Sequence, residues 1–174
     1  MTVVQIGNKI LRKISEDIPP DKITAKETRE LIAKMSEVLR KEPQGIGLAS
    51  PQIGVSKSLF IISEYVFKPS AFTQKENAEE LKKRKAGEKY AVFINPKILK
   101  ISKKKTVLSE GCLSVAGKFG EVKRSTNVTF EAYDENGKKI RRGAGGLLAQ
   151  VIQHETDHLN GRLFVDIAES MDKI

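Results

Sequence analysis

Apolar residues recur at helical spacing in an early stretch of the chain. Thr24 and Glu27 have the spacing of a capping box, in which two side chains satisfy backbone N–H groups at the start of a helix. The apolar positions that follow are Leu31, Ile32, Met35, Val38 and Leu39. We therefore predict a helix over residues 25–41.

A second helical pattern lies near the end of the chain. Its apolar positions are Leu147, Leu148, Val151, Ile152 and Leu159. Gly161 follows them, and glycine commonly ends a helix because it accepts the left-handed backbone conformation. We predict a helix over residues 146–160.

Shorter apolar or alternating runs predict β-strands between the two helices. These runs cover Ser58–Ile62, Tyr90–Ile94, Lys97–Ile101 and Asn127–Tyr133. The last run is followed by the turn sequence Asp134–Gly137 and then by Lys138–Arg142, an arrangement typical of a β-hairpin.

Two segments show no sustained periodicity. Residues 42–54 contain two prolines and three glycines, which indicates a structured loop. Residues 64–89 form a polar insertion, within which residues 75–85 predict a short exposed helix. Because the insertion carries none of the motifs described below, we expect it to lie outside the functional site.

The order of elements is helix, several strands and a late helix, which predicts an α+β fold with antiparallel β-sheets packed around the late helix. The 174 residues suffice for one hydrophobic core, and no repeat or long linker divides them. We expect a single catalytic domain over residues 1–174.

Charge and hydropathy narrow the class of protein. Lys and Arg number 31 against 22 Asp and Glu, a net charge of +9 that favours contact with polyanions. No nucleic-acid motif accompanies the charge, so we expect a solvated basic surface and no specific DNA partner. No apolar run is long enough for a membrane span and no secretory signal is visible, which predicts a cytoplasmic protein without a membrane partner.

The late helix carries a metal-binding pattern, His154-Glu155-Thr-Asp-His158. Residues four apart lie on one helix face, so both imidazoles can reach one ion while Glu155 flanks it. These are the only two histidines in the chain. The spacing predicts a metal site in which the carboxylate acts as a general base.

An open catalytic metal site usually has three protein ligands, so a third donor is needed. A third histidine six positions beyond His158 is excluded because Phe164 stands there. Upstream, Cys112 is the sole cysteine of the chain, within Ser109–Val115. It is either a small buried apolar residue or the third ligand.

Three stretches together resemble the signature motifs of peptide deformylases, and they occur in the order typical of that family. They are Gly45–Gln52, Glu110–Ser114 and Gln153–Gly161. The resemblance implies an enzyme that removes the formyl group from the N-terminal formylmethionine of newly synthesised proteins and releases formate. Its substrates would be N-formylmethionyl nascent peptides.

The resemblance also assigns roles to the metal-site residues. Cys112, His154 and His158 would bind one metal ion per chain, usually Fe²⁺, with Zn²⁺, Ni²⁺ or Co²⁺ able to replace it. Glu155 would serve as general base and acid. The side-chain amide of Gln52 would stabilise the developing oxyanion.

Further residues would complete that site. The backbone N–H of Leu113 would be the second oxyanion donor. The substrate-binding residues would be Ile46, Gly47, Glu110, Gly111, Leu147 and Val151. Ile46 and Gly47 would pair with the substrate backbone, and Ile46, Leu147 and Val151 are either the lining of a methionine pocket or ordinary core.

The chain departs from the family pattern at several positions. Ala116 stands where proline is common, and Ser50-Pro51 varies the usual pair of small residues. We expect no long C-terminal helix of the kind that docks some family members on the ribosome, although the basic surface could associate with it instead. The alternatives are a broader metallopeptidase and a non-catalytic RNA- or ribosome-binding module with a structural metal.

Overall fold

The computed structural model describes residues 2–68 and 77–173. In chain order its helices are α1 (Lys26–Lys41), α2 (Ala78–Ala86) and α3 (Gly146–Leu159). Its strands are β1 (Gly47–Ala49), β2 (Leu59–Ser63), β3 (Tyr90–Ile101), β4 (Lys105–Cys112), β5 (Val115–Ser125), β6 (Asn127–Tyr133), β7 (Lys139–Gly145) and β8 (Ala168–Lys173). The described helices include none long and apolar enough to cross a membrane.

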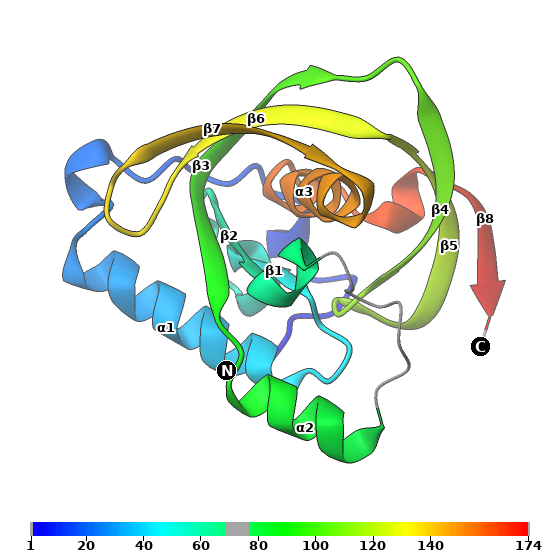
Figure 1. The fold of residues 1–174 in the computed structure, drawn as a ribbon, viewed down its shortest axis with the longest axis horizontal. Coiled ribbons are helices and arrows are strands. Elements are labelled where there is room, and N and C mark those ends of the chain that lie inside the picture. The colour runs from blue at the N-terminus through cyan, green and yellow to red at the C-terminus, as the bar shows by residue number, and fades with distance from the viewer. Residues whose placement is uncertain (1, 69–76, 174) are drawn as a thin grey trace.

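The strands form two antiparallel sheets around α3 (Figure 1). The larger sheet has the order β1-β2-β3-β6-β7, and the smaller has the order β4-β5-β8. The predicted α+β class, with antiparallel sheets packed around a late helix, is confirmed. β1 occupies one edge of the larger sheet, next to α3.

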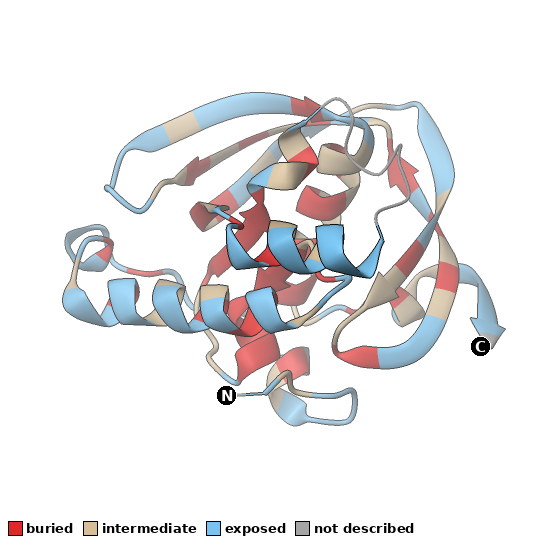
Figure 2. Ribbon diagram, turned by 60° about the horizontal axis from the view of Figure 1, so that its bottom comes forward, coloured by how far each residue is buried: buried red, intermediate tan, exposed pale blue. Residues whose placement is uncertain are grey.

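The larger sheet is covered on both faces. Phe60 and Ile62 of β2 pack in the core cluster that contains Val151 and Ile152 of α3. The alternate residues of β2, Leu59 and Ile61, pack in the cluster that contains the apolar side of α1. Successive side chains of a strand point to opposite faces, so a strand covered twice needs an unbroken apolar run. Figure 2 shows these buried segments gathered inside the molecule.

Several predicted elements are confirmed, with corrections at their ends. Helix α1 covers the predicted range, but the capping box is wrong: its N-cap is Ala25, without a side-chain cap, and Thr24 lies outside the helix. The strands predicted at residues 90–94 and 97–101 are one strand, β3, with a register shift between Ile94 and Lys97. The hairpin forms as β6 and β7.

Two segments differ more from the prediction. The loop at residues 42–54 contains β1 and a 3-10 helix, Ser50–Ile53, so it is more regular than expected. In the insertion, α2 forms as predicted, although residues 69–76 lie outside the described residues. The helix is exposed only in part, because Lys85 is buried.

Candidate metal centre

Three side chains with metal-binding atoms converge between α3 and the end of β4. The ligand atoms of Cys112, His154 and His158 all lie within 4.8 Å of one another. The two histidines stand one helical turn apart, with ring centroids 5.0 Å apart. Cys112, the last residue of β4, brings its Sγ to 3.2 Å from His158 Nε2. The predicted thiol and imidazoles are therefore brought together.

A buried carboxylate orients His154. Glu110, only 4 % exposed, lies with Oε2 at 2.9 Å from His154 Nδ1, so the Nε2 atom is left for a ligand. Arg124 donates to both oxygens of Glu110, at 2.8 and 2.9 Å, and also to Asp157 at 2.6 Å. Burial alone would raise the pKa of Glu110, but the hydrogen bonds from Arg124 and His154 outweigh it and lower the pKa to about 2. Glu110 therefore stays an anion.

His158 is the most enclosed of the three donors. It is buried, and its Nδ1 has no hydrogen-bond partner among the described residues. Burial holds the pKa of His158 well below its usual value. A neutral imidazole is the form that binds a metal ion, so this environment favours ligation.

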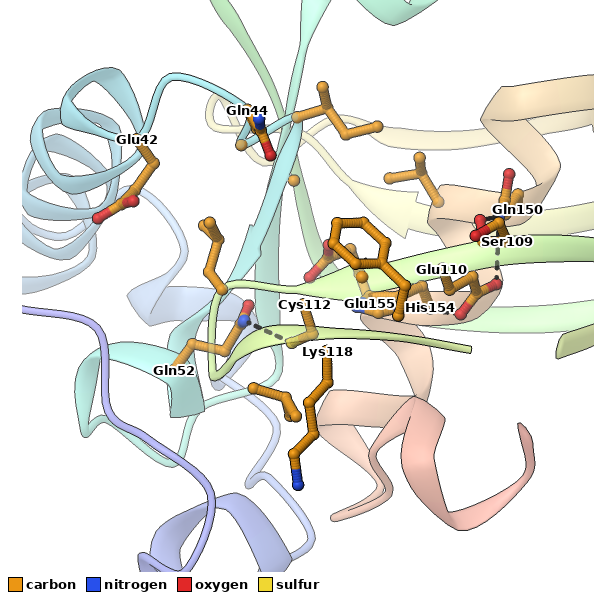
Figure 3. A pocket seen from close by; sticks show the side chains of 18 of the residues that line it. Glu42, Gln44, Gln52, Ser109, Glu110, Cys112, Lys118, Gln150, His154 and Glu155 are labelled. Carbon is orange, nitrogen blue, oxygen red and sulfur yellow. Dashed lines mark hydrogen bonds and ion pairs between the residues drawn. The ribbon is translucent and has the colours of Figure 1, made fainter. Parts of the chain in front are cut away.

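Gln52 faces Cys112 across the site (Figure 3). Its Oε1 accepts a 2.8 Å hydrogen bond from the Ala49 N–H, which fixes the plane of the amide. Its Nε2 then lies 3.5 Å from Cys112 Sγ and 3.3 Å from Ser114 Oγ. The 3-10 helix after β1 thus holds an amide donor at the ligand atoms.

Glu155 lies beside the two histidines and is also buried, at 4 % exposure. Its Oε2 has no partner among the described residues. Loss of hydration raises the pKa of Glu155 to about 7, against the opposing effect of His154. A Cβ added at Gly47 would overlap the Glu155 carboxylate, so glycine is required where β1 passes this side chain.

A pocket of about 510 Å³ opens onto these groups. All predicted site residues line it except the buried His158: Ile46, Gly47, Gln52, Glu110, Gly111, Cys112, Leu113, Leu147, Val151, His154 and Glu155. The sequence motifs therefore meet in one place, although they are far apart in the chain.

Comparison with known proteins identifies the family of this chain. Residues 1–173 match the family model described as polypeptide deformylase. The chain belongs to the polypeptide deformylase family.

Individual deformylases resemble the chain over most of its length. It is 42% identical over 166 residues to the peptide deformylase of Flavobacterium psychrophilum, covering 95% of this chain and 81% of that protein. It is 36% identical to the chloroplastic peptide deformylase 1A of Solanum lycopersicum, covering 94% of this chain and 58% of that longer protein. A crystal structure of the class I type b peptide deformylase from Acinetobacter baumannii, with Met-Ala-Ser bound, superposes with a TM-score of 0.78 at 30% identity, covering 95% of this chain and 96% of that one.

Membership of a family of metal-dependent hydrolases agrees with the donors found here. The chain is thus an enzyme, and its three donors form a possible metal site. Sequence reasoning missed two residues that support this deformylase site, Arg124 and Gln150. Gln150 lies one helical turn before His154 and donates to Ser109 O at 3.1 Å, so helical spacing could have found it. No local signal marked Arg124, which reaches Glu110 only through the pairing of β4 with β5.

Proposed function

We propose that this enzyme removes the formyl group from N-formylmethionyl peptides and releases formate. We also propose that residues 1–174 form one catalytic domain. The observation that supports the proposal best is the meeting of a cysteine, two histidines and a buried carboxylate in the pocket of a chain matched by the deformylase family model. The steps below assign the roles.

Cys112, His154 and His158 would hold one divalent cation per chain. A thiolate with two imidazoles is a soft donor set, which suits Fe²⁺ as well as Zn²⁺, Ni²⁺ or Co²⁺. Three protein ligands are typical of a catalytic site with an open position, whereas closed structural sites use four. When bound, such a cation supplies Lewis acidity, which polarises a carbonyl and makes a water molecule more acidic.

Glu155 would carry the proton. Its Oε2 has no hydrogen-bond partner within the described part of the chain, and its pKa is near 7, which suits a group that accepts a proton and returns it at neutral pH. Oε2 takes a proton from the attacking water as the new C–O bond forms. The same atom then protonates the leaving nitrogen as the C–N bond breaks, which gives formate and a free N-terminal amine.

Gln52 and Leu113 would stabilise the negative charge that develops on the formyl oxygen. The Gln52 amide is already oriented by its hydrogen bond from Ala49, so its Nε2 faces the ligand atoms and could exchange one of its long contacts for the formyl oxygen. Leu113 follows Cys112 directly and also lines the pocket. Its backbone N–H is the second proposed donor.

β1 would bind the substrate backbone. Among the described residues only β2 pairs with β1. The Ser63 N–H donates to Ile46 O at 2.8 Å, so Ile46 and Ser63 form a hydrogen-bonded pair next to the Gly47–Ile62 pair. Hydrogen-bonded and non-hydrogen-bonded pairs alternate along an antiparallel ladder. The N–H and C=O of Gly47 therefore point away from β2. We propose that an extended formyl peptide pairs with this edge.

The methionine side chain would enter the apolar part of the pocket. Ile46, Leu147 and Val151 line it, and they pack against or within the core cluster around α3. These three residues can therefore line a methionine pocket and belong to the core at the same time. Glu110 and Gly111 also line the pocket, where Gly111 is close to Phe119. The A. baumannii deformylase, crystallised with Met-Ala-Ser, supports a peptide ligand of this kind.

The decisive experiment compares acyl groups on one peptide. Protein purified without oxygen and loaded with a divalent cation is given formyl-Met-Ala-Ser and acetyl-Met-Ala-Ser, and formate, acetate and peptide fragments are measured. We expect rapid formate release and little acetate. Cleavage between amino acids would identify a broader metallopeptidase, and no turnover with bound metal would favour the non-catalytic alternative.

We propose Fe²⁺ as the resident metal. Anaerobic protein should contain about one iron per chain and lose turnover in air, because Fe²⁺ and a thiolate without a partner thiol are both open to oxidation. Protein loaded with Ni²⁺ should stay active in air. Cys112→Ser should weaken metal binding under both conditions, since a hydroxyl is a poorer ligand than a thiolate. Stoichiometric metal and full activity in that variant would place the third ligand elsewhere.

A basic arm offers a route to the ribosome in the cytoplasm, where we place the enzyme. Residues 97–107, where β3 leads into β4, carry five exposed lysines: Lys97, Lys100, Lys103, Lys104 and Lys105. We propose that they contact ribosomal RNA. Co-sedimentation with ribosomes should fall with salt and after replacing the five lysines by glutamine. Unchanged sedimentation of that variant would contradict the contact, while formate release from short peptides should be unaffected.

A further inference from the structure

A buried ammonium group from the insertion reaches the backbone of the pocket. Lys85 of α2 is only 5 % exposed. Its Nζ donates to Gly45 O at 2.6 Å and lies 3.4 Å from Leu39 O at the end of α1. It also forms an ion pair of 2.9 Å with Glu88 Oε2. Helix α2 is therefore linked to the residue that precedes Ile46 and Gly47.

Glu88 extends this link to the neighbouring strand. It accepts hydrogen bonds from Ser63 Oγ at 2.5 Å and from Tyr90 Oη at 2.9 Å. Ser63 in turn donates its backbone N–H to Ile46 O at 2.8 Å. The Gly45 carbonyl is thus held by the Lys85 side chain and the Ile46 carbonyl by the backbone N–H of Ser63, and Glu88 contacts both Lys85 and the Ser63 hydroxyl.

These two carbonyls fix the backbone from which Gly47 continues. Gly45, Ile46 and Gly47 all line the pocket, and Gly47 lies against Glu155. A peptide group is planar, so the held Gly45 carbonyl fixes the peptide plane that enters Ile46, and the held Ile46 carbonyl fixes the N–H of Gly47 in the next plane. We infer that Lys85 is a positioning residue for the reaction, which orients the Gly45–Gly47 backbone for pairing with the substrate peptide. This inference rests on the proposed function.

A contribution to the stability of the fold explains the buried Lys85–Glu88 ion pair poorly. A buried ion pair costs desolvation, and well-packed apolar residues at such positions are often as stable or more so. An apolar side chain at position 85 would nevertheless give the Gly45 carbonyl no donor. Arg84 and Tyr90 also contact Glu88, so the carboxylate stays fixed while Lys85 reaches across to the loop. Helix α2 and Glu88 of the insertion then support the site, although the composition of the insertion predicted that it would lie outside it.

The test uses the full-length, metal-loaded enzyme and two substrates that differ in backbone length. Lys85→Met keeps an unbranched side chain but removes the donor. Lys82→Met and Lys83→Met make the same change of charge at exposed positions of the same helix and serve as matched controls. kcat and KM are measured on formyl-Met-Ala-Ser and on formyl-Met, which lacks the Ala-Ser backbone that would extend along β1.

We expect Lys85→Met to lower kcat/KM for formyl-Met-Ala-Ser about tenfold, mainly through KM, because one misplaced hydrogen-bonding edge is worth about this factor. Formyl-Met should change less than about twofold, and both control variants should behave as wild type. Glu88→Gln, which keeps the shape of the side chain, should show the same selective loss and serves if Lys85→Met does not fold.

Two results overturn the inference while leaving deformylation intact. One is a wild-type length preference in both Lys85→Met and Glu88→Gln. The other is an equal loss on both substrates, which would show a general structural role. Failure of the proposed function is distinguished from either result, because the metal-loaded wild-type enzyme would then release no formate.

Discussion

Two buried carboxylates, Glu110 and Glu88, support different parts of the pocket by different means. Glu110 is paired with Arg124 and holds the ring of His154. Glu88 is paired with Lys85, which donates to the Gly45 carbonyl, and accepts a hydrogen bond from the Ser63 hydroxyl. The first carboxylate orients a side chain that binds metal, whereas the second orients the backbone proposed to bind peptide. On the proposed roles, we expect some substitutions to impair catalysis alone and others to impair substrate binding alone.

The largest expected effect comes from Glu155, which lies against Gly47 and interacts with His154. Glu155→Ala should keep the metal and the fold but lower kcat by ~10²–10⁴-fold, because the proton carrier is lost. Metal analysis, circular dichroism and formate release measure the three properties. Turnover close to that of the wild type would exclude Glu155 as the base.

Weakening the contact between Glu110 and the metal-site residue His154 should have the next largest effect on activity. Glu110→Gln keeps the shape of the side chain but weakens its hold on His154 and Arg124, and such changes typically cost about 10–100-fold in metal affinity or activity. The ratio of rates on formyl-Met-Ala-Ser and formyl-Met should stay that of the wild type. A changed ratio would show that the two carboxylates do not act independently.

A double variant tests directly whether the Glu110 and Glu88 groups act independently. Within the described residues, Glu110 and Glu88 share no hydrogen-bond partner. The double variant with Glu110→Gln and Lys85→Met should therefore show additive losses in kcat/KM, within about 0.5 kcal/mol. A larger coupling energy would contradict the division between metal side and peptide side.

The smallest effect should come from Tyr90, another hydrogen-bond partner of Glu88. Tyr90→Phe removes one hydrogen bond and should lower the free energy of unfolding by about 0.5–1.5 kcal/mol. Lys85 keeps its contacts in this variant, so KM for formyl-Met-Ala-Ser should change less than about twofold. Thermal unfolding and steady-state kinetics measure the two effects. A KM as high as that expected for Lys85→Met would mean that Tyr90, too, positions the peptide edge.

The sequence predicted the metal side far better than the peptide side. Helical spacing alone put His154 and His158 on one face, and the single cysteine offered a third donor. These residues carry their chemistry in side chains, and two of them lie close in sequence. Lys85 acts on main-chain carbonyls some forty residues upstream, so composition marked it only as one lysine in a basic run.

Elements that depend on tertiary pairing were also missed. β1 has three residues inside a segment rich in proline and glycine, too short to show an alternating pattern. The smaller sheet was not predicted because its strands are largely polar. Strand β8, Ala168–Lys173, is an example: it forms by pairing with β5, and its own sequence does not predict a strand. Thr24 also had the spacing of a cap, but α1 begins at Lys26 with Ala25 as its N-cap.

If β1 binds the substrate as proposed, its shortness limits the length of peptide backbone that the enzyme can bind. Three residues of strand span about 10 Å, enough to align with about three residues of an extended partner. Main-chain groups are the same in every polypeptide, so recognition at this edge is indifferent to the side chains that follow methionine. On the proposed function, a nascent chain qualifies as soon as its first few residues are free, whatever the rest of it will become. A single small enzyme could in this way serve a whole proteome.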